Sequence, residues 1–284
     1  MTITSNISAR EAAEIEIANA SGKPTVVFIH GLWLLAPSWK NWVDVFEEAG
    51  FAAVALDWPG DPETVAQANA NPKPMAKKSI KEVVDRCQSV IENLEIKPII
   101  VGHSFGGLMA QMLASRGLAK ATVAISPAPF RGVLPLPISV FKATWPVLSN
   151  LANRGRAIAL TYQQFKYGFA NAVPDAEAKS LHSTVHVPAP GLPIFQAATA
   201  NLNPWTQAKV DTRFAGRGPL LIIAAEKDHT VPLSISRASF RLQSKNKGLT
   251  EIVEMKARGH SLVFDSGWED VAKTALSFVS RNAG

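Results

Sequence analysis

The 284-residue sequence has one cysteine, Cys87, which excludes an intrachain disulfide framework and a zinc site built from several cysteines. No window approaches the ~18 uninterrupted apolar residues of a membrane-spanning helix. The first twenty residues carry Arg10, Glu11, Glu14 and Glu16 where a secretory leader would be apolar, and the C-terminal residues show no lipidation signal. We therefore expect a soluble, cytoplasmic protein without a membrane span.

Charged residues are also scarce, at 18%, whereas hydrophobic residues make up 47%, which is enough for a sizeable core and too much for a disordered chain. The 29 basic and 23 acidic residues give a net charge of +6. A nucleic-acid-binding protein concentrates such charge in a patch. The densest cluster here is four lysines between positions 73 and 81, with Glu82 and Asp85 close behind. We interpret it as a solvated face and expect no nucleic-acid partner; the oligomeric state stays open.

Short apolar runs alternate with helical patterns along most of the chain. Such alternation predicts right-handed crossovers and a mostly parallel, twisted sheet with helices on both faces, and near-continuous apolar strands are typical of strands buried on both sides. The strands are expected at residues 24–29, 51–56, 98–101, 121–125, 219–225 and 251–255. Helices are expected near residues 39–46, 80–94, 108–117, 234–243 and 268–278, and residues 61–78 are expected to form a loop.

This rhythm is interrupted between residues 127 and 208, a segment that contains ten prolines and two helical stretches, near 141–150 and 161–171. The alternation resumes afterwards. We therefore interpret residues 1–284 as a single α/β domain into which residues 127–208 are inserted as a helical cap. A separate second domain is the less favoured alternative, because the sheet pattern continues after the insertion.

The strongest chemical signal is Gly102-His103-Ser104-Phe105-Gly106, a G-x-S-x-G pattern. It directly follows a predicted strand and precedes a predicted helix, which is the arrangement of a nucleophile elbow. Side chains at positions 102 and 106 would collide with the neighbouring strand and helix. The context predicts that Ser104 is a nucleophile; the alternative is a tight strand–helix turn with an ordinary capping serine.

A serine hydroxyl needs a base to act as a nucleophile. Among the six histidines, His260 follows the last predicted strand and so lies at the same edge of the sheet as Ser104. We interpret His103, next to the serine, as structural. His182 and His186 are four residues apart and could share a helix face as metal ligands, but no H-E-x-x-H pattern accompanies them. We expect no metal and no cofactor.

The third member of a triad should be a carboxylate that orients the imidazole. Asp228 follows the predicted strand 219–225, and the order Ser104, Asp228, His260 along the chain is the order that a triad requires in a fold with a nucleophile elbow. Glu226 is the local alternative. Two weaker alternatives are Asp211 and Asp265.

The tetrahedral intermediate of acyl transfer needs hydrogen-bond donors for its oxyanion. The backbone N–H of Phe105, the residue after the nucleophile, is one candidate. The loop His30-Gly31-Leu32-Trp33 after the first strand should supply the other, from Leu32 or, second, from Trp33. We expect His30 to brace this loop by hydrogen bonding.

Together, the strand followed by His30-Gly31, the motif at residues 102–107, the Asp228 loop and the His260 loop resemble the α/β-hydrolase superfamily, and in particular its serine esterases and lipases with a helical cap. The resemblance covers about 200 residues of core and implies an eight-stranded type of sheet and acyl transfer to water. Two features depart from it. The glycine-rich extension of the oxyanion loop is absent, and residues 1–22 show no hairpin that would start the sheet. A serine at the elbow disfavours dehalogenases and epoxide hydrolases, which use an aspartate there.

We therefore expect hydrolysis of a small to medium hydrophobic carboxylic ester, with C–C hydrolysis, lyase or perhydrolase chemistry on the same triad, or a non-catalytic small-ligand receptor, as alternatives. Trp33 and the aromatic residues of the inserted segment should line an apolar pocket. No continuous amphipathic stretch suggests the exposed apolar face of an interfacial lipase, so short and medium esters should be preferred. The expected pocket residues are Trp33, Phe130, Trp145, Phe165, Phe169 and Phe195, with Phe141 also among the aromatics of the segment.

Overall fold

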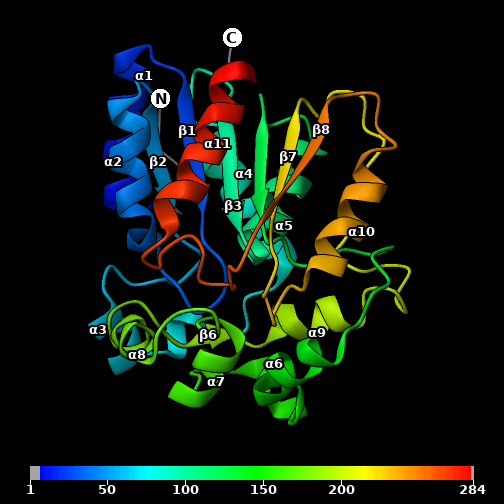
Figure 1. The fold of residues 1–284 in the computed structure, drawn as a ribbon. Helices are drawn as coiled ribbons and strands as arrows, with labels where there is room; N and C mark the ends of the chain where they lie inside the picture. Colours follow the sequence, from blue (N-terminus) through cyan, green and yellow to red (C-terminus); the bar gives the residue numbers. More distant parts are fainter. Residues whose placement is uncertain (1–6, 283–284) are drawn as a thin grey trace.

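Six strands form the main sheet of the computed structural model, which describes residues 7–282. Each neighbouring pair of strands is parallel, and the order is β2-β1-β3-β4-β7-β8 (Figure 1). The predicted α/β class is confirmed, and each predicted strand is found. The strands are β1 (Thr25–Ile29), β2 (Ala52–Leu56), β3 (Ile99–His103), β4 (Thr122–Ile125), β7 (Leu220–Ala225) and β8 (Thr250–Met255).

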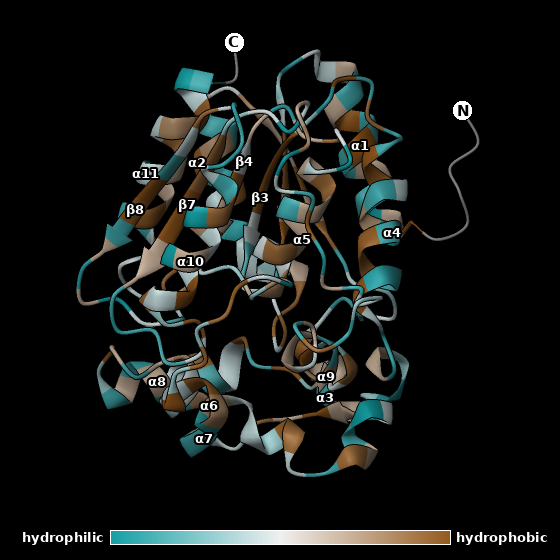
Figure 2. Ribbon diagram, turned by 90° about the vertical axis from the view of Figure 1, so that its right-hand side faces the viewer, coloured by the Kyte–Doolittle hydropathy of each residue, from teal (hydrophilic) through white to brown (hydrophobic). Residues whose placement is uncertain are grey.

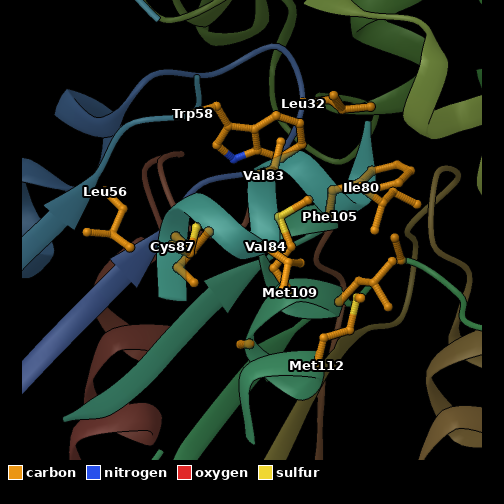
Figure 3. Close-up of a cluster of buried hydrophobic side chains, with 14 of the residues drawn as sticks. Leu32, Leu56, Trp58, Ile80, Val83, Val84, Cys87, Phe105, Met109 and Met112 are labelled. Carbon is orange, nitrogen blue, oxygen red and sulfur yellow. The ribbon is translucent and has the colours of Figure 1, made fainter. Parts of the chain in front are cut away.

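Helices cover both faces of this sheet because successive side chains of each strand point to opposite faces. Val27 and Ile29 of β1 pack in one core with α4 (Ile80–Ile91), α5 (Phe105–Ala114) and α10 (Leu233–Gln243). Val26 and Phe28 pack in the other with α2 (Lys40–Glu48) and α11 (Trp268–Asn282). Figure 3 shows the first core, where Cys87 lies among apolar side chains. Burial raises the pKa of its thiol to about 12.

A helix, α1 (Ala9–Ser21), precedes the first strand, where the sequence showed no hairpin. It packs along β2, an edge of the sheet, and its carboxylates accept hydrogen bonds from that edge: Glu14 from the N–H of Ala55 and Glu11 from the N–H of Asp57, both at 3.0 Å. Glu11 is fully buried and also pairs with Arg86. Covering an edge in this way prevents further strand pairing. The eight-stranded sheet implied by the resemblance is therefore not formed within residues 7–282, whose main sheet has six strands.

Residues 61–78, predicted as a loop, contain a short helix, α3 (Val65–Ala70), and a 3₁₀ turn (Lys73–Met75). Thr64 begins α3 in a reciprocal capping box with Gln67. The helix is stabilised by these local hydrogen bonds and shows little apolar periodicity, which is the feature that sequence patterns detect. The loop prediction is therefore wrong at α3.

The segment between β4 and β7 lies beyond one end of the sheet (Figure 1). Its two ends meet, since Arg131 N–H donates to the carbonyl of Ala208 over 2.8 Å. We call residues 127–208 the cap segment; their status as a separate subdomain remains a prediction. Both predicted helical stretches are present, with two further helices and a two-stranded antiparallel ribbon. The elements are α6 (Ile138–Leu148), a 3₁₀ turn (Leu151–Gly155), β5 (Ala157–Ile158), α7 (Tyr162–Gly168), α8 (Asp175–Thr184), β6 (Ala189–Pro190) and α9 (Leu192–Ala198).

Helix α6 carries apolar side chains that point to solvent: Ile138 is 86% exposed, Phe141 53% and Trp145 64%. The expectation that no apolar face is exposed is therefore wrong. The pattern was obscured because α6 is apolar on its inner face as well. Among residues 7–282, no helix combines the length and apolar composition needed to cross a bilayer.

Candidate active site

Ser104 lies at the turn between β3 and α5 with φ 56° and ψ −120°, in the left-handed half of backbone space that residues with a side chain rarely adopt. The turn closes because glycines flank it. A Cβ at position 102 would collide with the backbone of Gly106, and a Cβ at position 106 with the carbonyl of Ile29 in β1. This backbone conformation places the serine at the carboxyl edge of the sheet, directly before the N-terminus of α5.

The structure brings Ser104, His260 and Asp228 together. His260 Nε2 lies 2.9 Å from Ser104 Oγ, and His260 Nδ1 lies 2.6 Å from Asp228 Oδ2. The carboxylate can only accept, so Nδ1 carries the proton and Nε2 accepts from the serine hydroxyl. The imidazole therefore has the tautomer that removes a proton from Ser104.

The loop after β7 holds Asp228 in place. Its second oxygen, Oδ1, accepts the N–H groups of Thr230 at 2.8 Å and Val231 at 2.7 Å. These two hydrogen bonds fix the direction in which Oδ2 faces His260. Both partners of the Asp228–His260 pair have fully buried side chains.

The alternative carboxylates lie elsewhere. Glu226 accepts the N–H of Ala257 and pairs with Lys256 on the surface, and these contacts lower its pKa. Asp265 pairs with Arg258 and accepts from the Ser261 hydroxyl. The third alternative, Asp211, caps the turn at Arg213.

The loop after β1 approaches the serine directly. A Cβ at Gly31 would stand 2.7 Å from Ser104 Cβ and 3.3 Å from Ser104 Oγ, so only glycine permits the contact. Within residues 7–282, the N–H groups of Leu32 and Phe105 have no hydrogen-bond partner in the protein. They are the two donors expected to face an oxyanion.

His30 anchors this loop. Its Nδ1 lies 2.8 Å from the carbonyl oxygen of Gly31, and its Nε2 lies 3.0 Å from Asp61 Oδ2, which also accepts the N–H of Trp58. The Gly31 carbonyl and the Leu32 N–H belong to one planar peptide unit, so a ring that holds the carbonyl also fixes the direction of the N–H.

His103 packs beneath His260, as expected of a structural residue. Its Nε2–H donates to the backbone carbonyl of His260 at 3.0 Å, and the two ring centroids are 4.7 Å apart. Complete burial lowers the pKa of His103 well below its usual value, and a charge on His260 would lower it further. The ring is therefore neutral and positions the backbone of His260.

The end of α7, in the cap segment, braces both loops of the site. The ring of Phe169 contacts the imidazole of His260, and the Phe169 carbonyl accepts the N–H of Ser261. On the other loop, the Thr230 hydroxyl donates 2.8 Å to the carbonyl of Gly168. A segment remote in sequence thus connects the Asp228 and His260 loops.

An apolar cavity of about 100 Å³ lies beside Ser104, between the sheet edge and the cap segment. Its lining includes Ser104 itself and carries no charged side chain. Helix α6 contributes Val140, Thr144 and Leu148, which are four residues apart and so share one face of the helix. This spacing is visible in the sequence, but a search for aromatic residues does not find it. The lining residues are Ser104, Phe105, Ala128, Pro129, Leu136, Val140, Phe141, Thr144, Leu148, Ile194, Ala197, Ala198, Thr230 and Val231.

None of the six expected pocket residues lines this cavity. Trp145 faces solvent. Phe130, Phe165 and Phe169 are buried in the core, where Trp33 packs edge-on against Phe169 with ring centroids 5.7 Å apart. The sixth, Phe195, packs half-buried at the margin of the same core and beneath Arg154. Of the aromatics named from the sequence, Phe141 alone lines the cavity, beside Phe105 and smaller side chains.

His182 and His186 are held by the protein backbone. His182 Nε2–H donates to the carbonyl of Leu160, and His186 Nε2 accepts the N–H of Leu160 at 3.0 Å. Burial and the neighbouring His182 lower the pKa of His186 to about 4. In the part of the chain the structure describes, no three His, Cys, Asp or Glu side chains gather as a metal site would require.

Comparisons with known proteins agree with the fold. Residues 26–274 match the Alpha/beta hydrolase family. Among solved structures, a monoacylglycerol lipase from Paleococcus ferrophilus is 25% identical, with a TM-score of 0.65, and the match covers 92% of this chain and 96% of the lipase.

Two more distant structures share the fold. An extracellular alpha/beta-hydrolase from a Paenibacillus species is 17% identical, with TM-score 0.63 and coverage of 89% of this chain and 98% of that one. A pyrethroid hydrolase from Sphingobium faniae is 15% identical, with TM-score 0.63 and coverage of 92% and 98%. A search of curated proteins found no match.

Proposed function

The chain belongs to the alpha/beta hydrolase family, and on that premise we propose that it is a serine hydrolase that cleaves small to medium hydrophobic carboxylic esters through an acyl-enzyme on Ser104. The observation that carries the proposal is the 2.9 Å contact between Ser104 Oγ and His260 Nε2. The monoacylglycerol lipase and the pyrethroid hydrolase among the similar structures also act by hydrolysis, as their names state.

In the first half-reaction, Ser104 Oγ attacks the ester carbonyl while His260 Nε2 takes the hydroxyl proton. Asp228 stabilises the imidazolium that forms, because its Oδ2 accepts from Nδ1–H at 2.6 Å. His260 then gives the proton to the alkoxide leaving group as the C–O bond breaks. An ester bond on Ser104 and a free alcohol result.

The oxyanion of each tetrahedral intermediate would bind the N–H groups of Leu32 and Phe105. Such donors, fixed before the reaction begins, stabilise developing charge without reorganisation, and loss of one typically costs about 10²–10³ in kcat. The N-terminus of α5, which begins at Phe105, adds the favourable end of the helix dipole.

In the second half-reaction, His260 takes a proton from water, and the resulting hydroxide attacks the acyl carbonyl. The proton returns to Ser104 Oγ as the acid is released. We propose that the cap segment, residues 127–208, shields this step from bulk solvent. The uncharged lining beside Ser104 favours an uncharged apolar acyl group.

The experiment is a panel of p-nitrophenyl esters from C2 to C12, assayed with Ser104→Ala and with Ser126→Ala. Ser126 is a matched control: it is a buried serine at the end of the adjacent strand β4, also with positive φ, and its hydroxyl has no hydrogen-bond partner in the described residues. Turnover should fall by several orders of magnitude in Ser104→Ala and persist in Ser126→Ala. Absence of ester turnover in the folded wild type would point to C–C cleavage, lyase or perhydrolase chemistry or to a ligand receptor instead.

A further inference from the structure

Five exposed apolar side chains gather on and just before α6. We call them the outer cap patch. They are Leu134 at 71% exposed, Leu136 at 55%, Ile138 at 86%, Phe141 at 53% and Trp145 at 64%. Both ribbon views place α6 on the side of the cap segment away from the sheet (Figures 1 and 2). A contiguous exposed apolar surface of this kind usually indicates a site of interaction with another molecule or with a membrane.

A shallow groove between α6 and α7 continues the patch. Ile138, Phe141 and Trp145 form one wall, and Tyr167 and Lys142 belong to the same groove. The ammonium group of Lys142 lies 4.1 Å from the ring centroid of Tyr167. Tryptophan and tyrosine beside a lysine are the side chains that favour the boundary between lipid and water.

The cap segment is also basic. Between residues 127 and 208 there are six lysines and arginines and only two acidic residues. Both acids have partners: Asp175 pairs with Lys166 and Lys179, and Glu177 accepts the backbone N–H and the hydroxyl of Ser266. A negatively charged surface could therefore approach without meeting an unpaired carboxylate of the cap segment.

Two residues belong to the patch and to the catalytic cavity at once. Leu136 and Phe141 are more than half exposed, and both also line the cavity beside Ser104. The opposite side of α6 lines the cavity with Val140, Thr144 and Leu148. A surface that covers the patch would therefore lie over the entrance to the site.

We propose that the outer cap patch docks onto a lipid surface that carries anionic headgroups. The apolar side chains would enter the boundary of the lipid layer, and the basic residues of the cap segment would attract the headgroups. A second copy of this chain fits less well, because a symmetric dimer would bring two net positive cap segments together. If the chain is the ester hydrolase proposed above, the docked enzyme would receive apolar esters that partition into lipid; only this statement about substrates rests on the proposed function.

The test is co-sedimentation of the full chain, carrying Ser104→Ala to prevent hydrolysis of lipid, with vesicles of phosphatidylglycerol and phosphatidylcholine. The double variant Ile138→Gln/Trp145→Gln removes two patch residues that do not line the cavity, and Lys142→Gln removes the adjacent charge. Ile17→Gln, on α1, is the matched apolar control, because Ile17 is 67% exposed. Lys23→Gln is the charge control, because Lys23 is exposed and lies outside the cap segment. Each variant is also made with Ser104 intact, and its turnover of a water-soluble ester verifies folding.

We expect the parent protein to bind vesicles that contain phosphatidylglycerol. This binding should weaken when salt is added, and binding to vesicles of pure phosphatidylcholine should be weaker. Affinity should fall at least about tenfold in the double variant, since burial of one large apolar side chain is worth about that much, and less in Lys142→Gln. Equal binding of the double variant and Ile17→Gln, or no vesicle binding by the parent protein, would overturn the proposal. So would a dimer that the double variant dissociates. If the parent protein does not bind vesicles while the chain with Ser104 intact turns over the ester, docking alone is refuted. If the parent protein binds vesicles but the chain with Ser104 intact turns over no ester, the proposed function alone is refuted.

Discussion

The ring of Phe169 meets the imidazole of His260 nearly at right angles, with an interplanar angle of 77° and 4.8 Å between the ring centroids. Phe169 comes from the cap segment, and its carbonyl also accepts the N–H of Ser261 at 3.0 Å. The imidazole of His260, the proposed base, is therefore in ring contact with both His103 and Phe169. The cap segment contributes to the position of the base as well as to the cavity.

This contact predicts a defect in turnover for Phe169→Ala. The imidazole would gain freedom to leave the line between Ser104 and Asp228, so kcat should fall by about tenfold or more with little change in KM. Phe165→Ala is the control, because Phe165 stacks on Phe169 and is fully buried but is not in ring contact with His260. Steady-state kinetics of both variants on one short ester decide the matter. If Phe169→Ala and Phe165→Ala lose kcat equally, the loss comes from general destabilisation of the core and not from the contact with His260.

His30 is predicted to act through the oxyanion loop. His30→Ala would release the Gly31 carbonyl and lower kcat by roughly tenfold to a hundredfold, less than full loss of an oxyanion donor. Asp61→Asn should stay within about threefold of wild type. An asparagine whose amide nitrogen takes the place of Oδ2 donates to Nε2, which leaves the proton on Nδ1 free to bond Gly31; only the N–H of Trp58 loses its acceptor. An unchanged kcat in His30→Ala, or an equal loss of kcat in both variants, would show that His30 does not act through this loop.

The cavity predicts a preference for short acyl chains. At about 100 Å³ it is smaller than the ~300–1,000 Å³ of common ligand pockets. Leu148→Ala should enlarge it and shift the kcat/KM optimum to longer esters, since one methylene in an apolar pocket is worth about 1–3 kcal/mol. Leu151→Ala, an exposed control, should leave the C2–C12 profile unchanged. A wild-type optimum at C12 would contradict the small cavity.

Acid should weaken the cap segment through His186. The pKa of this buried ring falls from 6.5 to about 4 in the folded protein, so the unfolded chain binds the extra proton first. Stability is therefore full above about pH 6.5 and is lost as the pH falls toward 4, by up to about 3 kcal/mol from this group. His186→Gln can still accept the Leu160 N–H but does not titrate. Its melting temperature should fall less than that of wild type between pH 7 and 4.5; equal slopes would exclude His186 as the cause.

The sequence predicted the sheet and the set Ser104, Asp228 and His260 because each of these residues follows a parallel strand, and such strands bring their carboxyl ends to one edge. Periodicity could not reveal α1, since its carboxylates Glu11 and Glu14 serve the edge of β2 and look like solvent-facing charge. Both contacts are long-range in sequence, and local patterns do not contain them.

The cavity lining was missed for a different reason. Aromatic content does not say which face of a helix meets the site. On α6, Trp145 faces solvent, whereas Val140, Thr144 and Leu148 face the cavity. The direction of α6 depends on packing against α7 and α9, which the sequence alone does not specify.

Reaction with diethyl p-nitrophenyl phosphate tests most directly whether Ser104 is the residue that carries the acyl group, because the adduct of this reagent with a serine nucleophile is stable. We predict release of about one p-nitrophenolate per chain, one diethylphosphoryl group on the peptide that contains Ser104, and the same result for Ser126→Ala. Ser104→Ala should release none and remain unmodified. Stoichiometric labelling of a different residue, or ester turnover that survives in Ser104→Ala, would contradict the account.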